Sequence, residues 1–271
     1  MKIIERSLQE IGKSLLVTLP SGWTKSSGLK KGSKIKIMVN DTGSLSIAPE
    51  FTKQEKKKET VIEYDESFKR RFFKEYFEGN EKISIKIEKI SEKEKKQIYE
   101  FIKRFMNIQI IEENAGEIVL KCFRIDELSA VECLKRMYSL SLGMFEEKTE
   151  LDEIRDAITR FYYLLVMQVR RFLSEGKFAD ENQISLLRAM DIRMVAEKIQ
   201  RVAEILEKNR VSDKEIKEYY SKAFNYFIEE NFEKSLALWK EGNSLIKKYE
   251  KKNNEISQII RFGKEISMLV R

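Results

Sequence analysis

Proline occurs at only two positions in the 271-residue chain, Pro20 and Pro49, so nothing after the first fifth of the sequence blocks helix formation in this way. From Asp126 almost to Arg271, apolar residues recur at spacings of three and four, which predicts amphipathic helices packed as an antiparallel bundle. The first two helices are marked by Leu151, Ile154, Ile158, Phe161, Leu165 and Phe172, and by Ile184, Leu187, Met194, Ile199, Val202 and Leu206. Breaks are expected at 176–180 and 211–213, followed by a helix over about 214–230 and one long or broken helix over 232–270.

Residues 1–50 have a different pattern, with short β-rich runs separated by turn residues. Leu15–Leu19 predicts a strand that ends at Pro20, Ser21 is expected to cap a one-turn helix, and Gly28 is suited to the left-handed conformation that ends it. The alternation in Ile35–Val39 and the turn at 40–43 predict a hairpin with a strand at 45–47. About 50 residues bury too little apolar surface to fold alone, so we expect an intertwined dimer.

Residues 51–60 carry four lysines and almost no apolar side chains, which favours a solvated linker, although the basic run could also contact DNA phosphate. Residues 61–125 predict a small α/β unit. Its elements are a helix at 68–77, a strand at 82–87, a helix from Ser91 through Met106, and two strands at 107–112 and 117–123. Ser91 followed by Glu94 matches a capping box. The predicted fold class is therefore a multidomain α+β protein with boundaries at 1–50, 51–60, 61–125 and 126–271.

The charge balance and the absence of one residue type restrict the function. Lys and Arg number 52 against 45 Asp and Glu, a net charge of +7 that favours polyanionic partners. The chain has no histidine, which excludes Ser-His-Asp and Cys-His nucleophile systems. Cys122 and Cys133 are expected to be reduced, and neither a signal peptide nor a membrane-spanning run of about 20 apolar residues is present. We therefore expect a cytoplasmic protein that does not insert into a membrane.

The first segment contains a specific succession of motifs. Arg6–Ile11 is a basic strand, Gly12-Lys13-Ser14 precedes a strand that ends in Leu19-Pro20, and Gly28-Leu29-Lys30-Lys31-Gly32 follows a short helix. This order resembles the AbrB/SpoVT-like swapped-hairpin DNA-binding domain, in which two chains interleave into one β-barrel. The resemblance implies that double-stranded DNA is contacted by basic residues of the first strand and the following loop. The DNA-binding residues predicted in this way are Lys2, Arg6, Lys13, Ser14, Lys25, Lys30, Lys31 and Lys34.

Two later segments, Leu128–Tyr138 and Arg160–Val166, look like helices of the PhoU family. Together, the three segments resemble archaeal regulators of phosphate uptake that join an AbrB-like head to a PhoU-like bundle. Such a resemblance implies a homodimer held by its N-terminal domain, with a tail that docks on phosphate-transport or signalling proteins.

Bundles of the PhoU family carry acidic motifs that hold divalent or iron-type metal ions, and this sequence departs from them. Thr159 stands where an aspartate is expected, and Gln200–Glu204 replaces the expected Glu-Arg-Ile-Ala-Asp. Candidate metal ligands are Asp152, Asp156 and Glu204. The alternative is a solvated acidic face partnered by Arg155 and Arg160.

Neither a phosphate-binding loop nor a dinucleotide-binding fingerprint occurs, and no carboxylate pair is marked for acid–base catalysis, so we expect no enzyme. The leading hypothesis is a dimeric DNA-binding transcriptional regulator of phosphate uptake. The alternative is an adaptor that acts through contact of its helical tail with a transporter or kinase, with the head serving only for dimerisation. A metal- or phosphate-sensing bundle is compatible with the first hypothesis.

Overall fold

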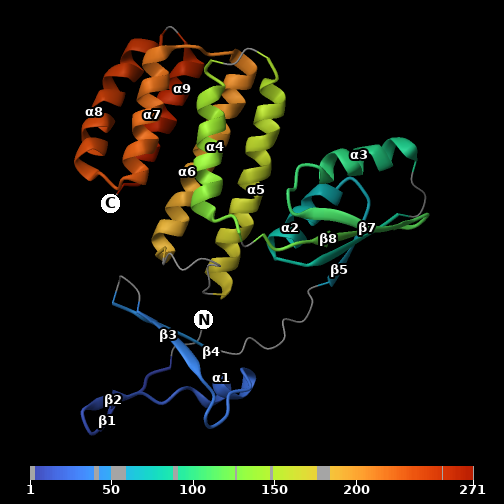
Figure 1. The fold of residues 1–271 in the computed structure, drawn as a ribbon, viewed down its shortest axis with the longest axis vertical. Helices are drawn as coiled ribbons and strands as arrows, with labels where there is room; N and C mark the ends of the chain where they lie inside the picture. The colour runs from blue at the N-terminus through green and yellow to red at the C-terminus, as the bar shows by residue number, and fades with distance from the viewer. Residues whose placement is uncertain are drawn as a thin grey trace. The chain divides into compact units, whose positions relative to one another are not determined.

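The computed structural model describes residues 4–39, 43–49, 59–87, 91–125, 127–146, 149–175, 184–251 and 253–270. The chain is an α+β protein that divides into two compact units, Met1–Lys57 and Lys58–Arg271, here called the N-terminal and C-terminal units. Small β-sheets form the first, while the second joins an α/β part to a helical bundle (Figure 1).

The N-terminal unit contains two separate antiparallel pairs and one short helix. β1 (Gln9–Ile11) pairs with β2 (Ser14–Leu16), α1 spans Ser21–Ser26, and β3 (Ile35–Val39) pairs with β4 (Leu45–Pro49). The predicted strand at 15–19 therefore starts one residue earlier and ends at Leu16. Part of the predicted turn, residues 40–42, lies outside the described residues.

Two local predictions about α1 have different outcomes. Gly28 has φ +67°, as expected for the residue that turns the chain after the helix. The prediction that Ser21 caps α1 was wrong, because Pro20 occupies the N-cap position and no side chain caps the helix. Ser21 is instead the first helical residue, and its carbonyl accepts a hydrogen bond from Thr24 Oγ1 at 3.0 Å.

The C-terminal unit begins with a four-stranded sheet of order β5-β6-β8-β7. Its elements are β5 (Glu59–Glu63), α2 (Phe68–Phe77), β6 (Lys82–Lys86), α3 (Glu92–Ile102), β7 (Ile108–Asn114) and β8 (Glu117–Cys122). β5 runs parallel to β6, and the other pairs are antiparallel. Both helices share one core with strand residues such as Ile83 and Leu120.

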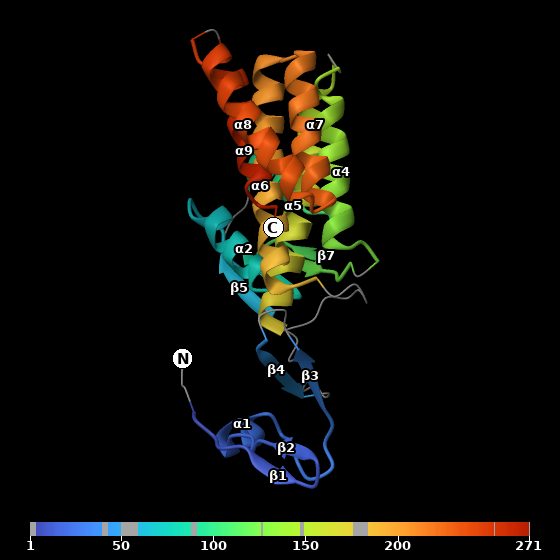
Figure 2. The ribbon, with the colours of Figure 1, turned by 90° about the vertical axis from the view of Figure 1, so that its left-hand side faces the viewer.

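The bundle contains six helices in the described residues. They are α4 (Ala130–Gly143), α5 (Leu151–Glu175), α6 (Leu186–Asn209), α7 (Lys214–Ile228), α8 (Phe232–Tyr249) and α9 (Asn254–Ser267). α9 lies against α6, α7 and α8, and α4, α5 and α6 each contact the other two. The side view shows the helices of the bundle running along one common direction (Figure 2). Searching the described residues finds no helix with the length and apolar content needed to cross a bilayer.

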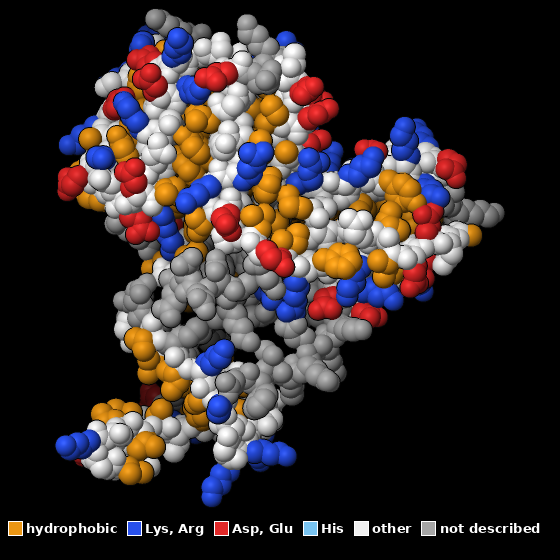
Figure 3. Space-filling view, viewed as in Figure 1, with side chains coloured by type: hydrophobic (Ala, Val, Ile, Leu, Met, Phe, Trp, Pro, Cys, Tyr) orange, Lys and Arg blue, Asp and Glu red, His pale blue; other side chains and the backbone are white. Residues whose placement is uncertain are grey.

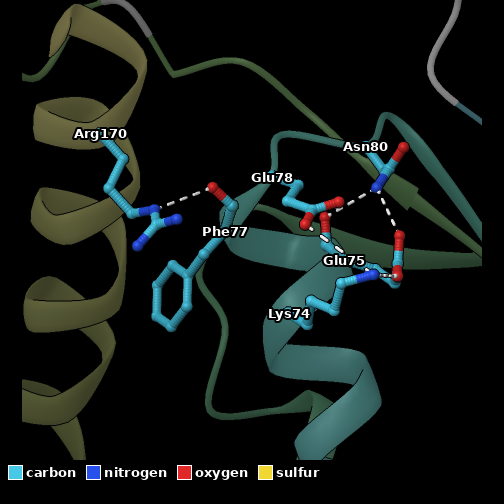
Figure 4. A network of polar contacts seen from close by, with 6 residues as sticks. All are labelled: Lys74, Glu75, Phe77, Glu78, Asn80 and Arg170. Atoms are coloured by element: carbon cyan, nitrogen blue, oxygen red, sulfur yellow. Dashed lines mark hydrogen bonds and ion pairs between the residues drawn. The ribbon is translucent and has the colours of Figure 1, made fainter. Parts of the chain in front are cut away.

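The α/β part and the bundle join through aromatic packing on α5. Tyr163 stacks on Phe105 with ring centroids 5.0 Å apart and meets Phe73 edge-on at 5.2 Å. Close by, Arg170 Nε donates a hydrogen bond to the carbonyl of Phe77 at 3.1 Å (Figure 4). The chain turns after α2 at Asn80, whose amide donates to the Glu75 carbonyl at 3.0 Å. α2 is therefore fixed to α5 at its C-terminal end.

Several predicted boundaries in the C-terminal unit differ from the structure. β5 begins at Glu59, inside the predicted linker, so the order is β-α-β-α-β-β rather than α-β-α-β-β. α3 ends at Ile102 instead of Met106, since the last turn tightens and Phe105 N–H bonds the Ile102 carbonyl at 2.9 Å. The segment at 232–270 is broken into α8 and α9, with Asn253 capping α9.

Candidate nucleic-acid interface

The first predicted DNA-contacting residues lie on and beside the β1–β2 hairpin. Arg6 precedes β1, Lys13 stands in the turn after Gly12, and Ser14 opens β2 opposite Ile11. Gly12 has φ +65°, a conformation that lets the chain reverse direction within the two residues between β1 and β2. Lys13 is therefore at the tip of the hairpin. All three side chains are exposed. Lys2, the remaining candidate of this segment, lies outside the described residues.

The other four candidates, Lys25, Lys30, Lys31 and Lys34, lie on α1 and on the connection to β3. A tight turn positions the middle pair, because Ser33 N–H bonds the Lys30 carbonyl and Ser33 Oγ accepts from Lys30 N–H, both at 2.9 Å. All four lysines are exposed. Lys36 on β3 is a further exposed cation, and it was not among the predicted contacts. Its position between Ile35 and Ile37 in an alternating strand indicates that its side chain faces water.

None of these cations has an acidic partner within the part of the chain that the structure describes. Arg6 Nη1 donates to the neighbouring Glu5 carbonyl at 3.2 Å, and among the described residues no ion pair involves the candidate lysines from Lys13 to Lys34. Residues 1–50 contain eight Lys and Arg against four Asp and Glu. Cations without an acidic partner among the described residues are available to attract a polyanion, so this unit is electrostatically suited to phosphate contacts.

The same unit leaves its apolar side chains uncovered. No described residue of the N-terminal unit is buried, and Val39 is 77% exposed. Apolar side chains gather on it in the space-filling view (Figure 3). The exposed large hydrophobic residues are Ile4, Leu8, Ile11, Leu15, Leu16, Val17, Ile37, Val39 and Leu45. A stable monomeric domain of about 50 residues would not expose nine large apolar side chains to water. The unit therefore lacks part of its core.

The three candidate metal ligands lie on two neighbouring helices of the bundle. Asp152 is exposed in the first turn of α5, Asp156 lies 2.8 Å from Arg155, and Glu204 of α6 lies 3.8 Å from Arg201. Thr159 is buried, and its hydroxyl donates to the Arg155 carbonyl at 3.0 Å. Among the described residues, no three Asp, Glu or Cys side chains come together as metal ligands. Arg155, which pairs with Asp156, is one of the two arginines that the solvated-face alternative named.

Comparison of the chain with protein-family models, with curated proteins and with solved structures finds no match.

Proposed function

We propose that this chain is a dimeric DNA-binding transcriptional regulator whose N-terminal unit contacts the duplex. The observation that carries the proposal is a combination found in the described part of that unit: exposed cations have no acidic partner there, and they lie beside exposed apolar side chains. A second copy would bury the apolar residues, and the cations would remain outside for phosphate contacts. The motif order of residues 6–32 supports the interleaved, swapped-hairpin form of this dimer.

The proposed DNA contacts come from Arg6 and Lys13, with Ser14 beside them and with Lys25, Lys30, Lys31 and Lys34 as outer contacts. Cations of this kind position a protein on the phosphate backbone and do not by themselves read sequence. In a twofold dimer each contact occurs twice, which favours a palindromic or shape-selected site. The resemblance of the whole chain supports genes of phosphate uptake as targets, with the bundle receiving the signal from a transport or signalling protein.

Charge reversal in the full-length chain tests the proposal. Fluorescence anisotropy with duplexes from upstream of phosphate-transport genes should show that R6E/K13E loses binding, while light scattering still reports a dimer. The matched control is K240E/K247E, which makes the same change of charge at two exposed positions of α8. Equal affinity of the R6E/K13E variant and the control would contradict the proposal. Absence of duplex binding by the wild type would favour the adaptor hypothesis.

A further inference from the structure

The connection from α1 towards β3 is held by a continuous run of local hydrogen bonds, although no described residue of the N-terminal unit is buried. The N–H groups of residues 27–29 donate to carbonyls of α1, at distances between 2.9 and 3.1 Å. The next N–H along the chain, that of Lys30, donates to Ser33 Oγ at 2.9 Å. Four consecutive backbone amides therefore have partners, and the backbone that leads to Lys30 and Lys31 is fixed by its own neighbours.

Lys30, Lys31, Gly32 and Ser33 form a β-turn, here called the lysine turn. The Ser33 N–H donates to the Lys30 carbonyl at 2.9 Å, which is the hydrogen bond that closes such a turn. Gly32 is the third residue of the turn and has φ +86°, the left-handed conformation that this position of a type II turn needs. Because Ser33 Oγ also accepts from the Lys30 N–H, two hydrogen bonds join the ends of the lysine turn.

We propose that Ser33 and Gly32 are positioning residues for DNA contact, because they hold the turn from which Lys30 and Lys31 reach the phosphate backbone. This inference rests on the proposed DNA-binding function and adds to it two residues that carry no charge. Both lysines are exposed and have no ion-pair partner among the described residues, whereas Ser33 is half-buried. A loop loses conformational entropy when it binds, and a loop that is already held in one conformation loses less.

The chemistry of the lysine turn suits the phosphate backbone better than the edges of bases. Lysine carries a compact charge on a flexible stem, which attracts phosphate oxygens without matching the donor and acceptor pattern of one base pair. Contacts of this kind position a protein on the duplex and carry no sequence information. Loss of either positioning residue should therefore weaken binding to a specific duplex and to a scrambled duplex by the same factor.

A glycine substitution in the full-length protein tests the turn without changing its charge. Nothing lies within 4 Å of a Cβ added at Gly32, so G32A acts only by making the positive φ unfavourable. G22A is the matched control, because Gly22 of α1 has equally open space around the added Cβ but no positive φ. In fluorescence anisotropy, G32A should bind duplex DNA roughly three to ten times more weakly than the wild type. G22A should bind like the wild type, and light scattering should report a dimer for both.

A double-mutant cycle shows whether the turn acts through its lysines. S33A removes the acceptor of the Lys30 N–H and should weaken binding to a similar degree, while S33T keeps the hydroxyl and should retain the affinity of the wild type. In the K30A/K31A background, neither S33A nor G32A should weaken binding further, because the cations that the turn positions are absent.

Two results would overturn the inference while leaving the proposed function in place. One is equal affinity of G32A and the wild type for a duplex that R6E/K13E no longer binds. The other is an equal loss of affinity with and without the two lysines, which would mean that Gly32 and Ser33 only support the fold. A wild-type chain that binds no duplex would contradict the proposed function, and the inference with it.

Discussion

Tyr219 of α7 illustrates how single residues set the spacing of the bundle helices. Its ring is almost fully buried between two glycines, Gly242 of α8 and Gly263 of α9. A Cβ at Gly242 would lie 2.3 Å from the Tyr219 hydroxyl oxygen, and one at Gly263 would lie 2.8 Å from its Cε1. Real Cβ atoms do not approach other atoms this closely, so a side chain at either position would force Tyr219 or a helix to shift.

We expect G242A to lower the free energy of unfolding by about 1–3 kcal/mol, the usual cost of overpacking a core. Alanine favours an α-helix more than glycine does, so without the contact with Tyr219 the substitution would raise the free energy of unfolding. A decrease therefore reports on that contact. G143A is the matched control, because nothing lies within 4 Å of the added Cβ at the end of α4. Urea unfolding followed by circular dichroism measures both. Equal stability of G242A and G143A would contradict this packing.

The two cysteines give a prediction for pH. Burial raises the pKa of the Cys122 and Cys133 thiols from the ordinary 9.0 to about 12. Because the folded pKa is raised, the stabilisation from the neutral thiols is complete below pH 9 and is lost as the pH rises towards 12. Near neutral pH the native protein should therefore react with a thiol reagent only on unfolding. Gln258 of α9 is exposed, so Q258C introduces an accessible thiol for comparison. If the two natural cysteines of the native protein react as fast as that thiol, they are not buried.

Among the elements, the start of α3 was predicted correctly because local chemistry decides it. Ser91 and Glu94 form the predicted capping box, with Ser91 N–H donating to Glu94 Oε2 at 2.9 Å and Glu94 N–H donating to Ser91 Oγ at 3.3 Å. A second box, formed by Ser129 and Glu132, begins α4. α9 begins with a simple N-cap, because the Asn253 side chain accepts a hydrogen bond from the Ile256 N–H. Asparagine is a common N-cap residue, so this signal was available, but the prediction left open whether 232–270 forms one long or one broken helix.

S129A should destabilise the C-terminal unit by about 0.5–2 kcal/mol, because the first turn of α4 loses the acceptor for the Glu132 N–H. S139A, at an exposed position within the same helix, is the control and should be close to neutral. Thermal unfolding distinguishes the two. The hydrogen bonds that the Glu132 carboxylate accepts from Ser129 lower the pKa of this carboxyl below its ordinary 4.5. The contribution of the carboxylate to the cap is therefore present above pH 4.5 and is lost as the pH falls further.

β5 could not be predicted because its pattern depends on a distant partner. Of its five residues only Ile62 is buried, and Val61 is 55% exposed. Its strand character comes from parallel pairing with β6, which lies across α2 in the sequence. The end of α3 was missed for a related reason, since Phe105 leaves the helix to reach the aromatic cluster around Phe72 and Tyr76.

On the scale of the whole molecule, hydrophobic periodicity predicted the order from strands to α/β part to bundle, but not how the parts join. The α/β part is fixed to α5 by Tyr163, Met167 and Arg170, residues that the periodic pattern assigned only to a generic bundle helix. The candidate DNA contacts were available from the motif order alone. That Arg6 and Lys13 lack acidic partners among the described residues, and that the apolar side chains beside them are uncovered, required the folded chain.

Salt dependence of duplex binding tests the central claim most directly. For the full-length chain, log K should fall linearly with log salt concentration, with a slope of about 0.9 for each phosphate contact. R6A/K13A removes four cations from a dimer, so the slope should become less steep by about 3.6. An unchanged slope, or a wild-type affinity that does not depend on salt, would contradict a DNA-binding role for the N-terminal unit.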